Sequence, residues 1–521
     1  MSRAVKLLRN IAANWLGFAV NAAVTLLLTP FVLHTLGEAR YGVWVISSSI
    51  VGYYGLLDLG FRGSINQHLT RYLAIPDYNR ASGTLSTAVV ALSTLGVGLA
   101  FLSIGAAYAA PMLWNFPPGM DSEAFWCVLV VGLTAAVQFV FFPFTAVFVA
   151  TQRFDLSNAI GISSRLLTAL CVYLALSSGL GLIGISVATC AVTLLDYLVR
   201  WRVALGLAPE LRVERTRASR AQLRELAGFG FWTFLMAINS YVYLHAQPLL
   251  IGALLPVAAV GHYALATGLA QQLNGALSPI GQVIYPAAAA LHSRSDRATL
   301  ERLYHDGTRL MSLVMVCAVA IAWFWAEDFY RLWIGPKYVA GDSPLPSVAL
   351  LLQILLGATV SGFFSNIAAQ TLMGTGKVRT VALLLIVGSA LNLGFTLALI
   401  GPLGLVGPAI ATVIASIAID AIAMPLALQR VTGLRAAAML RNAMPRPIVV
   451  ALLLVPTCYA LRELGAATSW PQLVMQGALA GIVALAVVLA VGVTAEERDR
   501  FVYRWLRRAA AARSVSAAAK D

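Results

Sequence analysis

Two arginines lie inside long apolar stretches of the chain, where a charged side chain is costly. Arg165 lies about eight residues into residues 157–178, roughly 12 Å along a helix, and Arg309 lies early in residues 306–326. A charged residue within a membrane span is by default a candidate functional residue. The planar guanidinium donates paired hydrogen bonds in a geometry that suits phosphate. Arg165 is therefore a candidate for binding a phosphate group, and Arg309 and Arg62, which follows an earlier apolar stretch, are further candidates for lining a binding cavity.

Three aspartates, Asp58, Asp196 and Asp420, are candidates for binding a coupling ion or for gating. Asp58 precedes Arg62 by four residues, and Asp196 precedes Arg200 by the same spacing, which lets an acid and a base pair on one helix face. For Asp196 an ion pair near the membrane surface is favoured, whereas for Asp58 a structural pair and a functional role both stay open. Asp420 has no basic residue within two helical turns, so it must be protonated, paired across helices or facing water.

Uncharged polar side chains gather in the apolar stretches near residues 20, 240 and 270. An unpaired amide in hydrocarbon is costly, so such a face should meet another helix or a water-filled cavity. For His245, a packed side chain is the alternative to a functional role. The candidates for lining a cavity are Asn21, Asn239, His245, Gln247, Gln271 and Asn274.

Composition places the chain in a membrane. Of its 521 residues, 60% are hydrophobic and 11% charged, and the mean hydropathy is +0.81. A soluble domain carries about 25% charged residues, and a membrane-spanning helix needs about 20 apolar residues. The sequence thus predicts an all-α polytopic protein with about fourteen spans, at residues 11–33, 41–61, 83–108, 124–149, 157–178, 181–204, 227–254, 258–291, 306–326, 346–373, 379–400, 403–428, 446–463 and 472–494. The eighth is too long for a straight span, so we expect it to tilt or to extend beyond the bilayer.

The basic residues predict the orientation of these spans. If the N-terminus is cytoplasmic, thirty of the 36 Lys and Arg residues fall in cytoplasmic segments and four in outer loops. Both termini are then cytoplasmic, and the net charge of +14 reflects membrane topology rather than nucleic-acid binding. The arginine-rich residues 205–226 are expected to form a solvated cytoplasmic linker, with a strap on anionic lipid as the alternative. Residues 495–521 are expected to form a basic cytoplasmic tail.

Two stretches of similar sequence, residues 181–196 and 404–420, begin 223 residues apart. Both open Gly-Leu-apolar-Gly, reach Ala-Thr seven residues later and end on an aspartate. A repeat at a long fixed spacing indicates a duplicated unit. We therefore expect two six-helix lobes in parallel orientation, residues 1–204 and 227–430, around a central cavity. The two helices in residues 446–494 lie outside the duplication.

Four segments give the chain a resemblance to a known family: residues 35–44 (TLGEARYGVW), 56–71, 150–158 (ATQRFDLSN) and 372–382 (LMGTGKVRTVA). They resemble the Wzx-like polysaccharide flippases of the multidrug/oligosaccharidyl-lipid/polysaccharide exporter (MOP) superfamily. In that family the first helix ends in proline, here Pro30, and the second ends in Asp-Leu-Gly followed by basic residues, here Asp58 to Arg62.

The resemblance implies a flippase in the bacterial inner membrane. Its cargo would be an oligosaccharide linked to undecaprenyl pyrophosphate, carried to the periplasmic leaflet for surface polysaccharide assembly. Membrane lipids would surround it, and a polysaccharide polymerase and chain-length proteins are candidate partners.

No catalytic motif, metal site or cofactor motif is found in the sequence. Gly179-x-Gly181-x-x-Gly184 matches a dinucleotide pattern but lacks the strand that this pattern requires, and no P-loop is present. The driving force must therefore come from an ion gradient, the membrane potential or the supply of substrate.

Two alternative functions stay open. A MATE-like cation or drug antiporter needs an acid in a cavity-lining helix; the first and seventh spans contain none, but Asp58 and Asp420 keep this alternative open. A membrane-embedded polysaccharide polymerase or ligase would be expected to carry a large, basic outer loop, whereas the outer loops here are short and nearly neutral.

Overall fold

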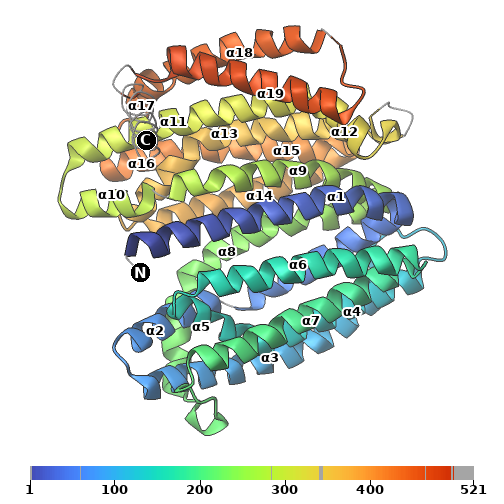
Figure 1. Ribbon diagram of the computed structural model, residues 1–521, viewed down its shortest axis with the longest axis vertical. Coiled ribbons are helices and arrows are strands. Elements are labelled where there is room, and N and C mark those ends of the chain that lie inside the picture. The colour runs from blue at the N-terminus through green and yellow to red at the C-terminus, as the bar shows by residue number, and fades with distance from the viewer. Residues whose placement is uncertain are drawn as a thin grey trace, which may run out of the picture. The chain divides into compact units, whose positions relative to one another are not determined.

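The computed structural model describes residues 3–58, 60–282, 284–339, 344–463, 465–494 and 497, and in these residues it is almost entirely helical. The helices (Figure 1) are α1 Arg3–Gly52, α2 Phe61–Ala74, α3 Tyr78–Leu113, α4 Asp121–Phe141, α5 Thr145–Ala150, α6 Phe154–Ser177, α7 Gly181–Leu207, α8 Arg220–Leu254, α9 Val257–Gln282, α10 Ile284–Ser293, α11 Arg297–Phe324, α12 Ala326–Trp333, α13 Val348–Gly374, α14 Val378–Leu403, α15 Val406–Ser416, α16 Met424–Thr432, α17 Ala436–Ala443, α18 Pro445–Glu463 and α19 Trp470–Val487. The 3-10 helix η1 (Tyr53–Asp58) and the π-helix η5 (Ile417–Ala423) join their neighbours.

Eleven helices, counted among the described residues, are long and apolar enough to cross a membrane. One of them, Trp15–Asp58, breaks at Gly37, whose φ of 78° is a left-handed conformation that glycine adopts readily. The first two predicted spans are therefore consecutive helices joined at this kink, while α8 and α9 match the seventh and eighth in position. The long eighth stretch divides into α9 and the short α10. The polytopic all-helical class is confirmed, and the count of fourteen stays a prediction.

Contacts divide the chain into two compact units. Unit 1 comprises residues 1–272, 341–351 and 382–415, and unit 2 comprises residues 273–340, 352–381 and 416–521. The predicted lobes follow the sequence repeat instead, so the two divisions differ within residues 227–430. The division into two six-helix lobes stays a prediction.

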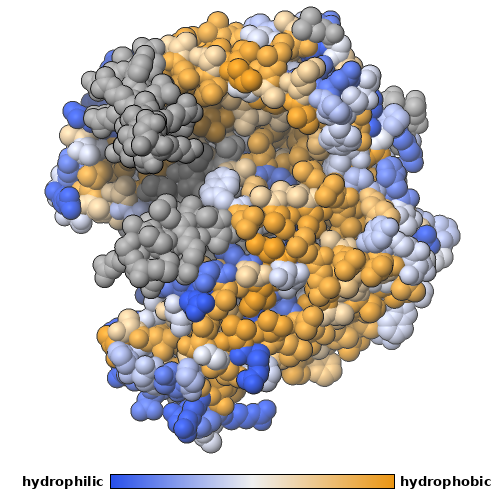
Figure 2. All heavy atoms as spheres, viewed as in Figure 1, coloured by the Kyte–Doolittle hydropathy of each residue, from blue (hydrophilic) through white to orange (hydrophobic). Residues whose placement is uncertain are grey.

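In unit 1, α6 and α7 pack side by side and present large apolar side chains outward (Figures 1 and 2). On α6 the outward residues include Leu166 and Leu170, which are 52% and 53% exposed. Such a continuous apolar surface is what a bilayer requires of the helices that face it. Inside, small residues allow close approach: a Cβ on Gly96 of α3 would lie 2.7 Å from the Ala136 carbonyl oxygen of α4.

The linker between the predicted lobes is bound to α3. Ser82 Oγ accepts from the Arg212 amide, Ser86 Oγ from the Glu214 amide and Thr87 Oγ1 from the Ser219 amide, each at 3.1 Å. The three hydroxyl-bearing residues are buried. Most residues of this linker are exposed, as a solvated linker requires, but α3 also satisfies three of its backbone donors that an extended segment would otherwise offer to water. The expectation of a cytoplasmic linker stays a prediction. We call residues 208–219 the strap.

The first turns of α8 continue this attachment. Thr87 donates to Gln222 Oε1 at 2.9 Å, and Glu225 accepts from the Tyr72 hydroxyl at 3.2 Å. The His68 Nδ1 lies 3.3 Å from the same Glu225 oxygen. Burial, and then the charge of Glu225, raises the pKa of Tyr72, which stays a hydrogen-bond donor at neutral pH.

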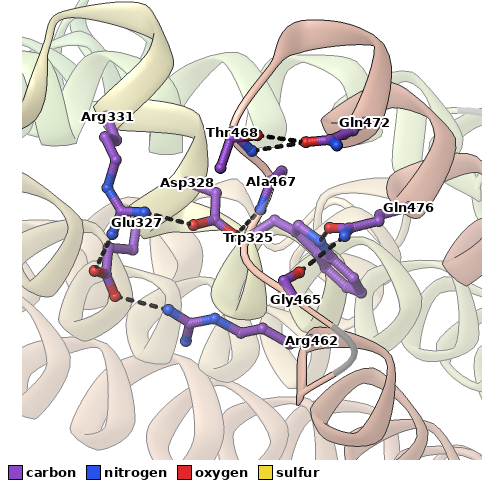
Figure 3. A network of polar contacts seen from close by, with 10 residues as sticks. All are labelled: Trp325, Glu327, Asp328, Arg331, Arg462, Gly465, Ala467, Thr468, Gln472 and Gln476. Atoms are coloured by element: carbon purple, nitrogen blue, oxygen red, sulfur yellow. Dashed lines mark hydrogen bonds and ion pairs between the residues drawn. The ribbon is translucent and has the colours of Figure 1, made fainter.

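In unit 2, α18 and α19 are fastened to α12 by polar contacts (Figure 3). Glu327 accepts from Arg331 Nη2 at 2.6 Å and from Arg462 Nη2 at 2.7 Å, and the buried Asp328 accepts from the Ala467 amide at 3.4 Å. Trp325 donates its indole N–H to Gln476 Oε1 of α19 at 2.8 Å. Two of the four predicted outer-loop basic residues, Arg331 and Arg462, thus share one carboxylate.

Candidate functional site

Arg165 of α6 lies against α1 in unit 1. Its Nη2 donates to Thr25 Oγ1 at 3.0 Å, and Asn21, an exposed residue, lies one helical turn before Thr25. Gly17 faces Asn158, and further along both helices Thr25 contacts Arg165. Residue numbers therefore rise together along the contact, so the two helices run in the same direction. The structure therefore places Arg165 close to the polar face predicted for the first span.

The charge of Arg165 has no acidic counterpart among the described residues. Its Nε is buried and has no hydrogen-bond acceptor, and its Nη2 donates to the neutral hydroxyl of Thr25. The Arg165 side chain as a whole is partly exposed, so the unmet bonding capacity is that of the buried Nε rather than of a fully desolvated charge. Arg165 is thus a preformed site of positive charge on a membrane-spanning helix.

Asp58 and Arg62 flank the turn between η1 and α2. Asp58 Oδ1 accepts from the Gly60 amide at 2.7 Å, and Gly60 has a φ of 79° that glycine tolerates. This local geometry explains the Asp-Leu-Gly sequence: the aspartate satisfies a free amide at the start of α2, and the glycine makes the turn. Asp58 is 8% exposed, and its Oδ2 lies 3.1 Å from Arg62 Nε.

The Arg62 guanidinium lies over the ring of Phe142, 4.0 Å from the ring centroid. The Arg62 side chain is 51% exposed. Asp58 and Arg62 line a small pocket whose other residues come from α3, from α7 and from the end of α4 with the turn after it: Leu92, Gln138, Phe139, Phe142 and Tyr197. An arginine that contacts a ring and is paired through Nε leaves its terminal N–H groups free to bind an anion.

Asp196 and Arg200, with the same spacing, form a closed pair between α6 and α7. Arg200 Nε donates to Asp196 Oδ2 at 2.6 Å, and its Nη1 donates to Ser157 Oγ at 3.0 Å. Ser164 donates to Asp196 Oδ1 at 2.6 Å. The Arg200 and Asp196 side chains are 15% and 14% exposed. The predicted ion pair is confirmed, and its groups are occupied by protein partners.

The polar residues of α8 contact protein groups in unit 1. Gln247 is 6% exposed, and its Nε2 donates to Asn392 Oδ1 at 3.0 Å and to Thr412 Oγ1 at 2.8 Å. Asn239 accepts from the Ser389 hydroxyl. Gln247 is thus enclosed in a satisfied network rather than open to a cavity.

Gln271 of α9 is exposed. His245 of α8 packs among aromatic rings. The His245 ring stacks on Tyr241 with centroids 6.1 Å apart and lies 6.0 Å from the Tyr53 ring. A Cβ on Gly52 would lie 2.3 Å from His245 Nε2. This close approach fits the packed alternative for His245, whose functional role stays a prediction.

The remaining candidates lie in unit 2. Arg309 is 8% exposed and pairs with Glu497, and its Nη2 lies 3.3 Å from Asp306 Oδ1. Asn274 Nδ2 donates to Thr359 Oγ1 at 3.3 Å. The charge of Arg309 is matched by two carboxylates, whereas that of Arg165 is matched by none among the described residues. This difference is not visible in the sequence, where both are arginines inside apolar stretches.

Asp420 lies in the π-helix η5, with the Ser365 and Ser416 hydroxyls at its carboxyl group. Among the residues that the structure describes, no basic side chain pairs with it. π-helical turns are frequent at functional sites. Its predicted role in binding a coupling ion or in gating stays a prediction.

Sequence reasoning missed five residues of the Arg62 pocket: Leu92, Gln138, Phe139, Phe142 and Tyr197. One signal was available, since Gln138 is the only amide side chain in the fourth predicted span, residues 124–149. Phe142 and Tyr197 carry no such signal, because aromatic residues are common near the ends of spans.

Comparisons with known proteins agree with this architecture. Residues 87–341 match a family described as polysaccharide biosynthesis protein. EpsK of Bacillus subtilis (strain 168), an uncharacterized membrane protein, is 21% identical over 499 residues, covering 95% of this chain and 97% of EpsK. A putative O-antigen transporter of Shigella flexneri is 20% identical over 399 residues, covering 73% of this chain and 88% of that protein.

Solved structures show the same fold. The lipid II flippase MurJ in an inward closed conformation has a TM-score of 0.65 at 13% identity, covering 90% of this chain and 97% of MurJ. An inward-facing MATE multidrug transporter has a TM-score of 0.62 at 15% identity, covering 79% of this chain and 98% of that structure. The predicted resemblance is confirmed: this chain is a multi-pass membrane protein with the fold of the MOP superfamily, similar to the transporters of polysaccharide biosynthesis.

Proposed function

We propose that this protein is a flippase for a polyprenyl-pyrophosphate-linked oligosaccharide of the undecaprenyl type. It moves this lipid from the cytoplasmic to the periplasmic leaflet of the bacterial inner membrane, by alternating access, for surface polysaccharide assembly. Both termini are cytoplasmic in this proposal. A polysaccharide polymerase and chain-length proteins would act on the delivered lipid.

The observation that carries the proposal is the uncompensated charge of Arg165. This guanidinium belongs to a membrane-spanning helix and donates to a neutral hydroxyl, and its buried Nε has no acceptor among the described residues. It can therefore bind an anion. Pyrophosphate supplies oxygens in the geometry that guanidinium binds bidentately. Binding this group would therefore give the Arg165 Nε the acceptor that it lacks among the described residues.

Arg62 is the second contact in the proposal. It lies after the second span, at the end that the distribution of basic residues predicts to be cytoplasmic, and its half-exposed side chain is accessible to an entering headgroup. The exposed Asn21 would hydrogen-bond sugar hydroxyls beside Arg165. The polyprenyl chain would stay in lipid along the apolar outer surface of the helices.

The test is a strain that lacks this gene and is complemented with Arg165 variants whose expression is verified. Arg165→Ala should reduce the surface polysaccharide by tenfold or more, since a bond to a charged group contributes about 1.5–3 kcal/mol. Arg165→Lys should restore part of it, because lysine keeps the charge but not the bidentate geometry. Arg153→Ala, at the start of the same helix, is the matched control and should act like the wild type.

Two results would count against the proposal. Normal polysaccharide with Arg165→Ala would remove this residue from the binding site. Absence of lipid-linked oligosaccharide accumulation in the cytoplasmic leaflet of the deletion strain would contradict the flippase function itself.

A MATE-like cation or drug antiporter is the second candidate, and Asp420 is the observation that favours it. An acid in a π-helix, beside two hydroxyls and without a basic partner among the described residues, suits a proton or a monovalent cation. Increased drug susceptibility of the deletion strain, with normal polysaccharide, would support this candidate over the flippase.

A further inference from the structure

In the Asp58–Arg62 pair the carboxylate is buried and both of its oxygens have partners, whereas the guanidinium is exposed and has N–H groups that bond no described residue. Both Asp58 oxygens have partners, the Gly60 amide at 2.7 Å and Arg62 Nε at 3.1 Å, and Asp58 is 8% exposed. Arg62 is 51% exposed, and no hydrogen bond joins its two terminal nitrogens to another described residue. An anion that approaches this pair therefore reaches Arg62 while Asp58 stays behind it.

Phe142 limits the directions from which that anion can approach Arg62. The guanidinium carbon lies 4.0 Å from the ring centroid, so the ring blocks approach to Arg62 from that side. One edge, at Nε, is occupied by Asp58. A phosphate group that binds at the remaining edges brings its charge close to the Asp58 carboxylate, and two neighbouring anions disfavour each other.

We propose that Asp58 competes with phosphate-type anions for Arg62. When such an anion binds Arg62, the Asp58 carboxylate binds one proton. The proton comes from the solution on the same side and bonds to a carboxylate oxygen of Asp58. When the anion leaves, the proton returns and the ion pair forms again. This inference rests on the proposed function for the identity of the anion, a pyrophosphate headgroup.

The surrounding groups do not provide another proton acceptor in the physiological range. The titratable residues that line the pocket are Asp58, Arg62 and Tyr197, and phenols and guanidiniums titrate far above neutral pH. Asp196 and Arg200 lie near Tyr197 on α7, where they are paired with each other. Gln138 supplies an amide that can hydrogen-bond either form of the Asp58 carboxyl group.

The test is calorimetric titration of the purified full-length protein in neutral detergent with inorganic pyrophosphate. Titration in two buffers of different ionisation enthalpy gives the number of protons bound per anion. The wild type should bind more protons than Asp58→Asn, by up to about one per anion, and this difference removes the protonation of pyrophosphate itself. Asp58→Asn should bind pyrophosphate about two- to fivefold more tightly, since a half-exposed pair competes weakly.

Asp155→Asn is the matched control, because Asp155 pairs with the partly exposed Arg153 and does not line the pocket; it should match the wild type in both measurements. Phe142→Leu should weaken binding with or without Asp58, which shows that the site is the stacked arginine. Asparagine can keep the bond to the Gly60 amide, so Asp58→Asn should fold, and an unchanged unfolding temperature checks this.

Equal proton uptake and equal affinity in the wild type and Asp58→Asn would overturn the inference. A parallel titration with phosphatidylglycerol in mixed micelles separates the sources of phosphate, since the same proton uptake there would assign the site to bulk anionic lipid and overturn its assignment to the pyrophosphate headgroup. The inference and the proposed function fail separately: binding can behave as expected while the deletion strain distributes its lipid-linked oligosaccharide normally.

Discussion

Two Asp-x-x-x-Arg pairs in unit 1 have the same spacing and different surroundings. Arg200 uses Nε, Nη1 and Nη2 to bind Asp196 and Ser157, and both members of that pair are about 15% exposed. Arg62 bonds Asp58 through Nε, rests on Phe142 and is half exposed. The spacing determines that an acid and a base can pair, whereas the neighbouring helices determine whether the arginine has capacity left for a ligand.

The neighbours explain this difference. At the closed pair, α6 supplies Ser157 and Ser164, two hydroxyls that complete the bonds of the arginine and of the aspartate. At the open pair, the end of α4 and the turn after it supply Gln138 and Phe142, and the aromatic ring covers a face without using an N–H group. A closed pair stabilises the fold, and an open pair keeps its binding capacity.

The largest expected difference is in stability. Arg200→Ala should lower the free energy of unfolding by about 3 kcal/mol, because it leaves Asp196 largely buried and without its counter-ion. Arg62→Ala should cost less, since among the described residues Arg62 bonds Asp58 alone, whereas Arg200 also binds the Ser157 hydroxyl and carbonyl of α6. Thermal unfolding of both variants in the same detergent makes the comparison, and equal losses would contradict the division into closed and open pairs.

A smaller effect is expected when the closed pair is partly opened. Ser157→Ala removes one acceptor of Arg200 but leaves the Ser157 backbone carbonyl, which accepts at 3.3 Å. The loss should be about 1 kcal/mol, the net contribution of one hydrogen bond. A loss as large as that of Arg200→Ala would mean that Asp196 contributes little to holding Arg200.

The smallest expected effect on stability is at the ring below the open pair. Phe142→Leu keeps an apolar side chain and removes the cation–π contact, which contributes about 0.5–1 kcal/mol at exposed sites. Its stability should therefore stay within about 1 kcal/mol of the wild type while pyrophosphate binding weakens. A large drop in the unfolding temperature would show that the ring serves packing first.

Features that depend on local sequence could be predicted. The kink at Gly37, the turn at Gly60 and the pairing of Asp196 with Arg200 each arise from residues at most a few positions apart. Hydropathy also placed the helices, because the apolar length that a membrane requires is visible in the sequence.

Features that depend on tertiary contacts could not be predicted. Glu497, the partner of Arg309, is 188 residues away in the chain, so the sequence gives no reason to separate Arg309 from Arg165. The enclosure of Gln247 depends on Asn392 and Thr412, which belong to other helices. The docking of residues 208–219 depends on hydroxyls of α3 that are 128 to 132 residues away in the chain.

The strap has a consequence for how the chain can be divided in experiments. A protease site, fluorescent protein or chain break is commonly placed in the connection between two similar halves, on the assumption that this connection is spare length. Here such an insertion between residues 208 and 219 would separate the Arg212, Glu214 and Ser219 amides from Ser82, Ser86 and Thr87. Co-expressed halves that are divided after residue 207 would leave these three hydroxyls without their partners, so a first half that keeps the strap should assemble better with the second.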